Sequence, residues 1–331
     1  MSKKVLITGG AGFIGLHLAN RLLDEGCQVH LVDNFSRGVN DIDLTETLKR
    51  NQTTFENLNI NNINDVERLD TDYDVIFHLA AIIGVVHVLE RPYDVLSENI
   101  RMLENMIDFA RRQKKLSRLF FASTSEVYAG TLKYFELPIP TPESTPIAIT
   151  DLSQHRTSYM LSKIYGEALC RQSGIPFTIF RPHNVYGARM GMSHVIPEQL
   201  KKSFEAKDKD MIDVFSVDHT RCFCFIDDAI EMLWRMMNCN NCENQTLNLG
   251  TQSPEVTMKN LAEVCHNATQ KKLFINENPA TPGSPYRRCP DMNKTIELID
   301  FESQVDLHDG IAKTYDWYRE YIFEGKNISA R

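Results

Sequence analysis

The sequence predicts an α/β fold with a doubly wound parallel sheet and a smaller C-terminal region, and three observations lead to this prediction. An apolar run from Val5 to Ile7 is followed at once by a turn with three glycines and then by a helical pattern. Short β-rich runs alternate with helical segments through the first half of the chain. This regularity weakens in the second half. Alternation of this kind is typical of a parallel sheet with helices on both faces.

The glycine-rich turn predicts a dinucleotide-binding strand–turn–helix unit of the Rossmann type. Gly9 allows the tight turn from strand to helix, Gly12 lacks a Cβ so that a pyrophosphate can approach the backbone, and Gly15 lets the helix pack close to the sheet. The free N–H groups at the start of the helix, together with its dipole, then hold the phosphate charge. A glycine turn with a purely structural role is the alternative.

The second strand indicates which dinucleotide is bound. The run Gln28–Val32 ends in Asp33, an acidic residue about 20 positions past the glycines. A carboxylate at this place accepts hydrogen bonds from the adenine ribose hydroxyls and repels a 2′-phosphate. We therefore expect NAD as the cofactor, although Arg37 keeps NADP as an alternative.

The remaining strands and helices of the first half follow the same alternation. Further strands are expected at Thr53–Leu58, Asp74–Ala80, Arg118–Ser123 and Pro176–Arg181. Long amphipathic helices are expected at Tyr93–Arg112 and Tyr159–Arg171. Ligands bind at the carboxyl ends of the strands in such sheets, so the loops after Ala80, Ser123 and Arg181 are expected to line the site.

The chain is expected to divide into residues 1–182, an NAD-binding domain, and residues 183–331, a smaller substrate-binding region. Helical stretches in the second part are expected at Ile196–Ala206, Asp227–Met237 and Met258–Ala268. Two runs, Ile212–Ser216 and Thr246–Leu249, are candidates for strands that return to the main sheet. Pro279–Pro290 is rich in proline, glycine and arginine and is expected to be an irregular loop.

Composition excludes several classes of protein. The 331 residues are 42% hydrophobic and 24% charged, as in an ordinary globular protein. A formal net charge of −8 argues against a nucleic-acid or acidic-membrane partner. We find no transmembrane span and no signal peptide, so we expect a cytoplasmic location with free thiols. Cys239 and Cys242 have C-x-x-C spacing without a second ligand pair, so no metal site is predicted.

Tyr159 and Lys163 are the central candidates for chemistry. Their i, i+4 spacing puts a phenol and an ammonium on one face of a helix. The ammonium and the positive nicotinamide of an oxidised cofactor are expected to lower the phenol pKa. A tyrosinate can then take a proton from a substrate hydroxyl while the carbinol hydride passes to the nicotinamide. An exposed helix pair without function is the alternative.

With these residues, the chain resembles the extended short-chain dehydrogenase/reductase superfamily, and within it the NAD-dependent nucleotide-sugar epimerases and dehydratases. The resemblance runs nearly end to end and in one order. It rests on the motifs at residues 8–15, 33–36, 78–81, 123–128, 181–187 and 221–228, together with Tyr159 and Lys163.

The resemblance implies roles for individual residues. Thr124 hydrogen-bonds the reacting sugar oxygen alongside Tyr159, and Lys163 also holds the nicotinamide ribose. Asn62 and Ile63 lie where the family places an Asp and an apolar residue beside the adenine. The other expected cofactor contacts are Gly9, Gly12, Phe13, Ile14, Gly15, Asp33, Asn34, Leu79, Ala80, Ala81, Asn99, Ser123, Tyr159 and Lys163.

The substrate implied by the resemblance is a nucleotide-diphosphate sugar. Asn184 and Arg221 look like the family's contacts to the diphosphate, where arginine supplies a planar donor fork. Arg287 and Arg288 are weaker candidates for the same task. Ser125 and His183 are expected to contact substrate, although for His183 a packing role is equally open. The family also pairs its two long helices across a two-fold axis, so a homodimer is expected.

Glu126 bears on the reaction that follows oxidation of the sugar at C4. A carboxylate two residues after Thr124 resembles the dehydratases and decarboxylases, where it acts at C5. Ser125 stands where 4,6-dehydratases of this type have an Asp, which counts against that class. Epimerisation is the leading expectation. A UDP-glucuronate-decarboxylase-like enzyme, a 4,6-dehydratase-like enzyme and a C4 dehydrogenase are alternatives, and an NAD-sensing protein without turnover is a remote one.

Overall fold

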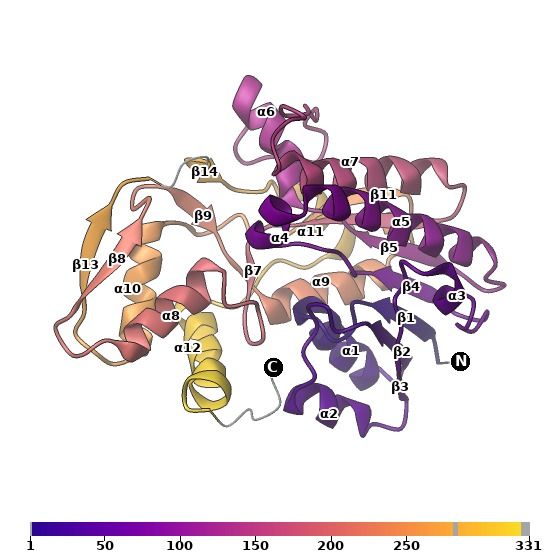
Figure 1. Cartoon of the computed structure of the whole chain (residues 1–331), viewed down its shortest axis with the longest axis horizontal. Coiled ribbons are helices and arrows are strands. Elements are labelled where there is room, and N and C mark those ends of the chain that lie inside the picture. The colour runs from indigo at the N-terminus through magenta and orange to yellow at the C-terminus, as the bar shows by residue number, and fades with distance from the viewer. Residues whose placement is uncertain (1, 281–283, 326–331) are drawn as a thin grey trace.

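A parallel sheet forms the centre of the molecule. The computed structural model describes residues 2–280 and 284–325. Among these residues, seven parallel strands lie in the order β11-β6-β5-β4-β1-β2-β3 (Figure 1). They are β1 (Lys4–Thr8), β2 (Gln28–Asp33), β3 (Thr53–Asn57), β4 (Val75–His78), β5 (Arg118–Ala122), β6 (Phe177–Pro182) and β11 (Gln245–Leu249). The expected doubly wound α/β fold is confirmed.

Helices cover both faces of the sheet because successive strand residues point to opposite sides. Val5 and Ile7 of β1 belong to one buried cluster, whereas Leu6 between them belongs to the other. The first face carries α1 (Phe13–Asp24), α2 (Ile42–Leu48), α9 (Ile226–Asn238) and α11 (Asn293–Ile299). The second carries α3 (Ile63–Val66), α4 (Val85–Glu90), α5 (Pro92–Arg111) and α7 (Thr157–Gln172).

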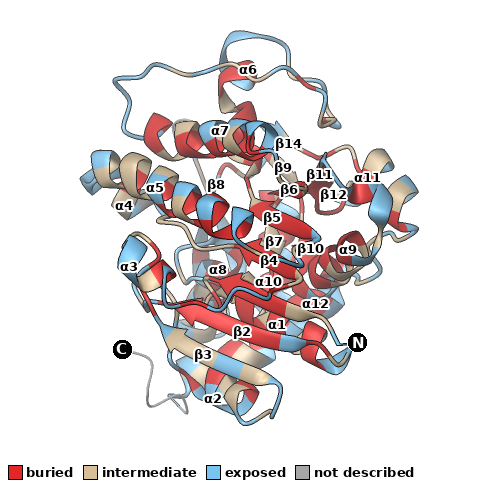
Figure 2. Cartoon of the chain, turned by 90° about the vertical axis from the view of Figure 1, so that its right-hand side faces the viewer, coloured by how far each residue is buried: buried red, intermediate tan, exposed pale blue. Residues whose placement is uncertain are grey.

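The strands in the middle of the sheet are buried along their length, and the edge strand β3 is not. Figure 2 shows β4 and β5 in the colour of buried residues, and β3 largely as intermediate or exposed; β1 is buried along most of its length as well. β5 leads into the short 3-10 helix η1 (Ser125–Tyr128) and then α6 (Ala129–Tyr134). The motif at residues 123–128, which follows β5, therefore lies at the carboxyl ends of the strands, as does the glycine turn that follows β1.

The second half of the chain contributes β11 to the main sheet and otherwise forms small sheets. In the described residues these are β8 (Met211–Phe215) with β13 (Phe274–Asn278), β7 (Val185–Tyr186) with β10 (Cys224–Phe225), and β9 (Thr220–Cys222) between β12 (Glu255–Thr257) and β14 (Arg287–Arg288). The remaining elements are α8 (Val195–Glu205), η2 (Asn240–Cys242), α10 (Met258–Ala268), α12 (Leu307–Tyr318) and η3 (Arg319–Phe323).

The two candidate returning strands have different outcomes. The run at Thr246–Leu249 lies in β11 and pairs with β6, as expected. The run at Ile212–Ser216 does not return to the main sheet, because β8 pairs with β13 instead. The expected irregular loop Pro279–Pro290 contains β14, and its residues 281–283 lie outside the described residues.

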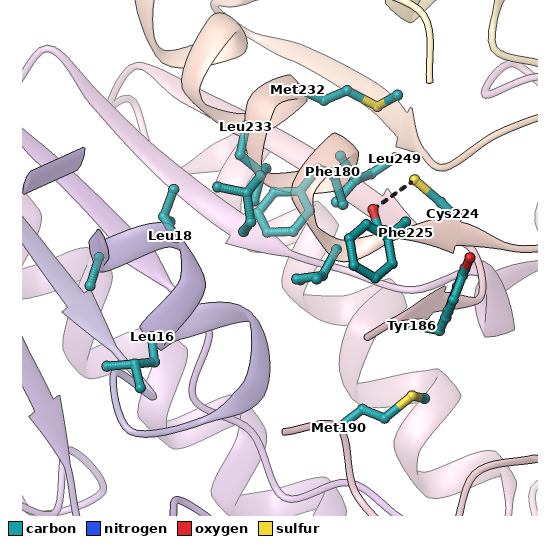
Figure 3. Close-up of a cluster of buried hydrophobic side chains, with 14 of the residues drawn as sticks. Leu16, Leu18, Phe180, Tyr186, Met190, Cys224, Phe225, Met232, Leu233 and Leu249 are labelled. Atoms are coloured by element: carbon teal, nitrogen blue, oxygen red, sulfur yellow. Dashed lines mark hydrogen bonds between the residues drawn. The ribbon is translucent and has the colours of Figure 1, made fainter. Parts of the chain in front are cut away.

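One buried cluster joins the first and second halves. Figure 3 shows Leu16 and Leu18 of α1, Phe180 of β6, and Met232 and Leu233 of α9 in this cluster. Tyr186, Met190 and Phe225 of the second half belong to it as well. The cluster holds the loops after β6 against the start of α1. Within residues 2–280 and 284–325, no helix is both long and apolar enough to cross a membrane.

Candidate active site

The glycine turn has a shape that only glycine permits. Gly9 has a φ of +74°, and its N–H donates to the Val32 carbonyl at 2.8 Å. A Cβ at Gly15 would lie 2.2 Å from the Gly9 oxygen, and a Cβ at Gly9 would lie 2.8 Å from the Ala80 nitrogen. Gly12 is the N-cap of α1 and no side chain caps this helix, so its first N–H groups face outward. The turn thus fits a dinucleotide pyrophosphate.

Asp33 lies beside this turn at the carboxyl end of β2. Its carboxylate accepts hydrogen bonds from the backbone N–H of Ala11 at 3.1 Å and of Phe35 at 2.8 Å. Burial raises the pKa of Asp33, and those N–H groups and Arg189 act in the opposite direction. The neighbouring Asn34 is exposed and accepts from the Ser36 N–H. The position of Asp33 next to the turn fits an adenosine ribose.

The loop after β4 forms another wall of the proposed cofactor site. Leu79, Ala80 and Ala81 follow β4 directly, and the Ala80 N–H donates to the Thr8 hydroxyl at 3.4 Å. The side-chain amide of Asn99 on α5 forms two hydrogen bonds with the backbone of Ile82 in this loop: its oxygen accepts from the Ile82 N–H at 2.7 Å, and its nitrogen donates to the Ile82 carbonyl at 3.0 Å. The Asn99 side chain therefore positions the loop.

The remaining expected cofactor contacts lie at the ends of two helices. Phe13 and Ile14 are the first residues of α1 and are half-buried. Asn62 caps α3 by accepting from the Asn64 N–H, and the adjoining Ile63 side chain is exposed. Their roles toward a cofactor stay predictions.

The structure brings Tyr159, Thr124 and Lys163 together at the carboxyl end of β5. Tyr159 and Lys163 lie one turn apart on α7, and Thr124 follows β5. The Thr124 hydroxyl is hydrogen-bonded to the Tyr159 phenol and accepts from the Glu126 N–H at 3.2 Å. Lys163 is 4% exposed, and its ammonium donates to the Ala122 carbonyl at 2.8 Å and lies 5.8 Å from the centre of the Tyr159 ring. The phenol of Tyr159, the hydroxyl of Thr124 and the ammonium of Lys163 are therefore neighbours at the carboxyl end of β5.

Burial has the largest effect on the pKa of Tyr159 in the protein without cofactor. Burial raises the pKa of Tyr159 above its usual value, and the charge of Glu126 raises it further. The hydrogen bond from Thr124 and the charge of Arg37 act in the opposite direction. Burial also lowers the pKa of Lys163 to about 8. The Lys163 ammonium donates to the Ala122 carbonyl, and the expectation that this ammonium and the nicotinamide of bound NAD together lower the phenol pKa stays a prediction.

Glu126 forms an ion pair that links η1, which follows β5, to the short strand β14 of the second half of the chain. Its carboxylate lies 2.9 Å from the Arg288 guanidinium of β14, and both side chains are partly exposed. Arg221 of β9 is near both groups, since their charges shift the Arg221 pKa in opposite directions. Burial is the main cause that lowers the Arg221 pKa, to about 10. Glu126, Arg288 and Arg221 therefore form one charged cluster near Tyr159.

Arg221 is held by the late loop in this structure. Its guanidinium donates to the carbonyl oxygens of Thr220 at 2.6 Å and Pro285 at 2.7 Å, and to the Ser284 hydroxyl at 3.2 Å. Arg287, the weaker candidate next to Arg288, is bound to Glu255 at 2.6 Å. Of these arginines, Arg288 forms an ion pair with a catalytic candidate, Glu126.

A buried network of hydrogen bonds lies next to the catalytic candidates. Glu167 lies one turn beyond Lys163 on α7 and accepts from the Ser123 hydroxyl at 2.6 Å and from Arg181 at 2.8 and 2.6 Å. Arg181 also donates to the Tyr128 hydroxyl at 2.5 Å. The Ser123 side chain, expected at the cofactor, is thus turned toward Glu167. The sequence analysis missed Glu167, although its i, i+4 spacing from Lys163 is a signal that could have found it.

Two expected substrate contacts, His183 and Asn184, are hydrogen-bonded within the protein, although the His183 Nδ1 atom is buried without a hydrogen-bond partner. The His183 ring is 1% exposed, and its Nε2 atom lies 3.1 Å from the Asn248 amide oxygen. Burial lowers the His183 pKa to about 3, so the ring is neutral. Asn184 has a φ of +43° and donates to the Cys222 carbonyl at 2.9 Å. Ser125 is buried in η1.

Arg189 connects the second half to the glycine turn, which the sequence analysis did not foresee. Its guanidinium donates to the Ala11 and Gly12 carbonyls at 3.3 Å and lies 2.7 Å from the Asp41 carboxylate. This contact fixes the outer side of the turn. Arg37 lies near both Tyr159 and His194, as their mutual charge effects indicate. In the described part of the chain, no cluster of three or more His, Cys, Asp or Glu side chains could hold a metal ion.

Comparisons with known proteins agree with this geometry. Residues 5–250 match the sequence model of the NAD dependent epimerase/dehydratase family. The chain is 32% identical to UDP-N-acetyl-alpha-D-glucosaminuronate decarboxylase of Bacillus cytotoxicus, covering 97% of this chain and 99% of that protein. It is 30% identical to UDP-glucuronic acid decarboxylase 1 of Danio rerio, covering 98% and 75%. A crystal structure of UDP-glucuronic acid 4-epimerase from Bacillus cereus, in complex with UDP-glucuronic acid and NAD, superposes with a TM-score of 0.83 at 26% identity, covering 96% and 99%.

Proposed function

The chain belongs to the NAD-dependent epimerase/dehydratase family, and from this premise we propose that it decarboxylates a UDP-linked hexuronic acid after oxidising the sugar at C4. The general activity, an NAD-dependent enzyme acting on a nucleotide sugar, follows from the family and its relatives. The observation that carries the finer proposal is the Glu126–Arg288 ion pair beside Tyr159 and Thr124. The names of the curated relatives support the same reaction.

The first step is removal of the proton from the C4 hydroxyl. Tyr159 takes this proton in its phenolate form, which the positive charge of bound NAD would favour, and Thr124 holds the same oxygen through its hydroxyl. NAD, when bound, supplies the acceptor for the C4 hydride and returns a hydride at the end of the cycle. Lys163, whose ammonium donates to the Ala122 carbonyl, would hold the ribose of the nicotinamide. Gly9, Gly12, Gly15 and Asp33 would hold the dinucleotide.

The second step breaks the bond between C5 and C6. A ketone at C4 makes the C6 carboxylate a β-keto acid, so carbon dioxide leaves and the electron pair of the broken bond moves to the C4 oxygen. Tyr159 and Thr124 stabilise that oxygen by hydrogen bonds. A proton from solvent then replaces the lost carboxylate at C5, relayed by Glu126, whose carboxylate Arg288 holds in place. Arg221 and Arg288 contribute positive charge for the substrate diphosphate and carboxylate.

Epimerisation at C4 is the second candidate and was the leading expectation from sequence. The superposition on a UDP-glucuronic acid 4-epimerase favours it. It needs the same Tyr159 and Thr124, but the hydride returns to the opposite face and C6 stays in place. A 4,6-dehydratase or a C4 dehydrogenase is supported by fewer observations, since Ser125 stands at the place of the expected acid.

Product analysis separates these candidates. The purified protein is incubated with NAD and, separately, UDP-glucuronate and a UDP-linked N-acetylhexosaminuronate, and the products are examined by mass and proton NMR. Decarboxylation predicts release of carbon dioxide and a pentose product. An inverted C4 centre at unchanged mass would replace the proposal by 4-epimerisation.

The variant Glu126→Gln tests whether Glu126 takes part in protonation of the sugar at C5. It is expected to retain oxidation at C4 and to form the decarboxylated nucleotide sugar about 100-fold more slowly, because the group that relays the C5 proton is removed. In heavy water, wild-type protein is expected to place solvent deuterium at C5. An unchanged decarboxylation rate in E126Q would remove Glu126 from the mechanism.

A homodimer through α5 and α7 is part of the proposal. These helices pack side by side, and large apolar side chains near them are exposed, including Tyr93 at 76% and Tyr165 at 45%. Exposed apolar clusters of this kind are typical of subunit contacts. Sedimentation is expected to give a dimer at micromolar protein and a monomer for Tyr165→Glu. A wild-type monomer would contradict this part. The cytoplasmic location stays a prediction.

A further inference from the structure

Two cysteines follow the proposed substrate arginines on neighbouring strands. β9 and β14 run parallel, with Arg288 opposite Arg221. Cys222 and Cys289 each come one residue later, so the register places them next to each other. Backbones of adjacent strands lie about 5 Å apart, within the Cα separation that a disulfide spans. The two thiols are therefore neighbours because of strand pairing, although they are far apart in the sequence.

The contacts of the two thiols confirm that they are close. Both sulfurs donate to the carbonyl oxygen of Gln252, each at 3.4 Å. The two thiols are also hydrogen-bonded to each other, which raises the pKa of Cys222 and lowers the pKa of Cys289. Both side chains are almost fully buried. Around them, Arg287 favours the thiolates, whereas Glu255 and Asp291 oppose them.

We propose that Cys222 and Cys289 are a reversible disulfide-forming site that couples thiol oxidation to nucleotide-sugar binding. The oxidant class is a low-molecular-weight disulfide. β14 is a two-residue strand at the edge of its sheet, so local opening of this strand gives the reagent access. The coupling to binding rests on the proposed function, which assigns Arg221 and Arg288 to the substrate.

The reaction proceeds in two exchanges. The Cys289 thiolate attacks one sulfur of the reagent, breaking its S–S bond and releasing one thiolate. The Cys222 thiolate, after losing its proton to solvent, attacks the Cys289 sulfur of the mixed disulfide and releases the second thiolate. The protein loses two protons and two electrons, and the reagent takes them up and is reduced to two thiols. A dithiol reductant reverses both steps.

The new bond changes the strands that carry the arginines. Sulfurs that share the Gln252 carbonyl move to a bond length of about 2 Å and give up their hydrogen bonds to that oxygen. Because Arg221 and Arg288 immediately precede these cysteines, their backbone positions shift with the bond. We expect the oxidised protein to bind a nucleoside diphosphate about tenfold more weakly, the equivalent of one charged hydrogen bond.

The experiment uses the full chain and oxidised glutathione, with UDP as the binding probe. Oxidised protein is digested without reduction and its peptides are mapped, and UDP affinity is measured by calorimetry before oxidation, after it, and after dithiothreitol treatment. The expected result is a Cys222–Cys289 cross-linked peptide, weaker UDP binding and recovery on reduction. The wild-type mapping needs no variant, so a folding defect cannot obscure it.

Two variants complete the test. Cys289→Ser is expected to abolish both the cross-link and the loss of affinity. Cys239→Ser, which alters the other neighbouring thiol pair, is expected to retain both. Absence of the Cys222–Cys289 peptide overturns the site, and a cross-link with unchanged UDP affinity overturns the coupling. If the reduced protein fails to bind UDP, the arginine assignment in the proposed function is wrong, which is seen before any oxidation.

Discussion

Replacing Glu167 by Gln is expected to destabilise the fold and disturb the catalytic residues together. Glu167 and Arg181 are 4% and 2% exposed and are bound through two short contacts of 2.8 and 2.6 Å. Gln has the same shape but leaves the Arg181 charge buried without a counter-charge. Breaking such a pair costs about 3–5 kcal/mol. Because Arg181 keeps its bonds to Tyr128 and the Glu143 carbonyl, we expect the lower end, about 3 kcal/mol.

Urea unfolding measures this loss of free energy directly. The matched control is Glu277→Gln, which removes an ion pair with Lys259 of 2.7 Å whose two side chains are about half exposed. We expect that control to change the unfolding free energy by less than about 1 kcal/mol. Turnover of E167Q should also fall, since Glu167 joins α7 to Ser123 next to Thr124. An E167Q variant as stable as E277Q would refute the reasoning.

Two further predictions follow from the glycine turn and from a buried histidine. Gly15→Ala is expected to weaken NAD binding at least about tenfold, because its Cβ would lie 2.2 Å from the Gly9 oxygen. In the control Gly26→Ala the new Cβ meets nothing within 4 Å, so this variant should lower the stability, because Gly26 has a φ of +75°, but leave the calorimetric NAD affinity unchanged. The folded pKa of His183, about 3, lies below its unfolded value near 6.5, so the unfolded chain binds more protons between these pH values. The unfolding free energy should fall with decreasing pH in this window by up to about 1.4 kcal/mol per pH unit for this residue, and His183→Gln should remove that part of the slope; an identical slope in the variant would contradict the assignment.

The core of the fold was predictable because its signals are local. The central strands are apolar runs buried on both faces, and α5 and α7 carry helical patterns over many residues. The same holds for the Tyr159–Lys163 pair, whose spacing fixes its geometry on one helix. Glu167 belongs to this class as well, since its spacing from Lys163 repeats that pattern.

The rest of the site depends on tertiary pairing that no local pattern encodes. β7, β9, β10 and β14 have only two or three residues each, too few to show a period. Their pairing brings Arg288 to Glu126 and Cys289 to Cys222. The effect of burial on the pKa of Tyr159 was not predictable for a related reason, because burial is a property of the packed chain.

The central claim is that Tyr159 removes the proton of the C4 hydroxyl during oxidation of the sugar. The direct test follows the absorbance of reduced cofactor when UDP-glucuronate is mixed with NAD-loaded wild-type protein and with Tyr159→Phe at equal NAD content. The account predicts that the variant forms reduced cofactor about 100-fold or more slowly while its bound NAD is unchanged. Formation of reduced cofactor at the wild-type rate in Y159F would contradict it.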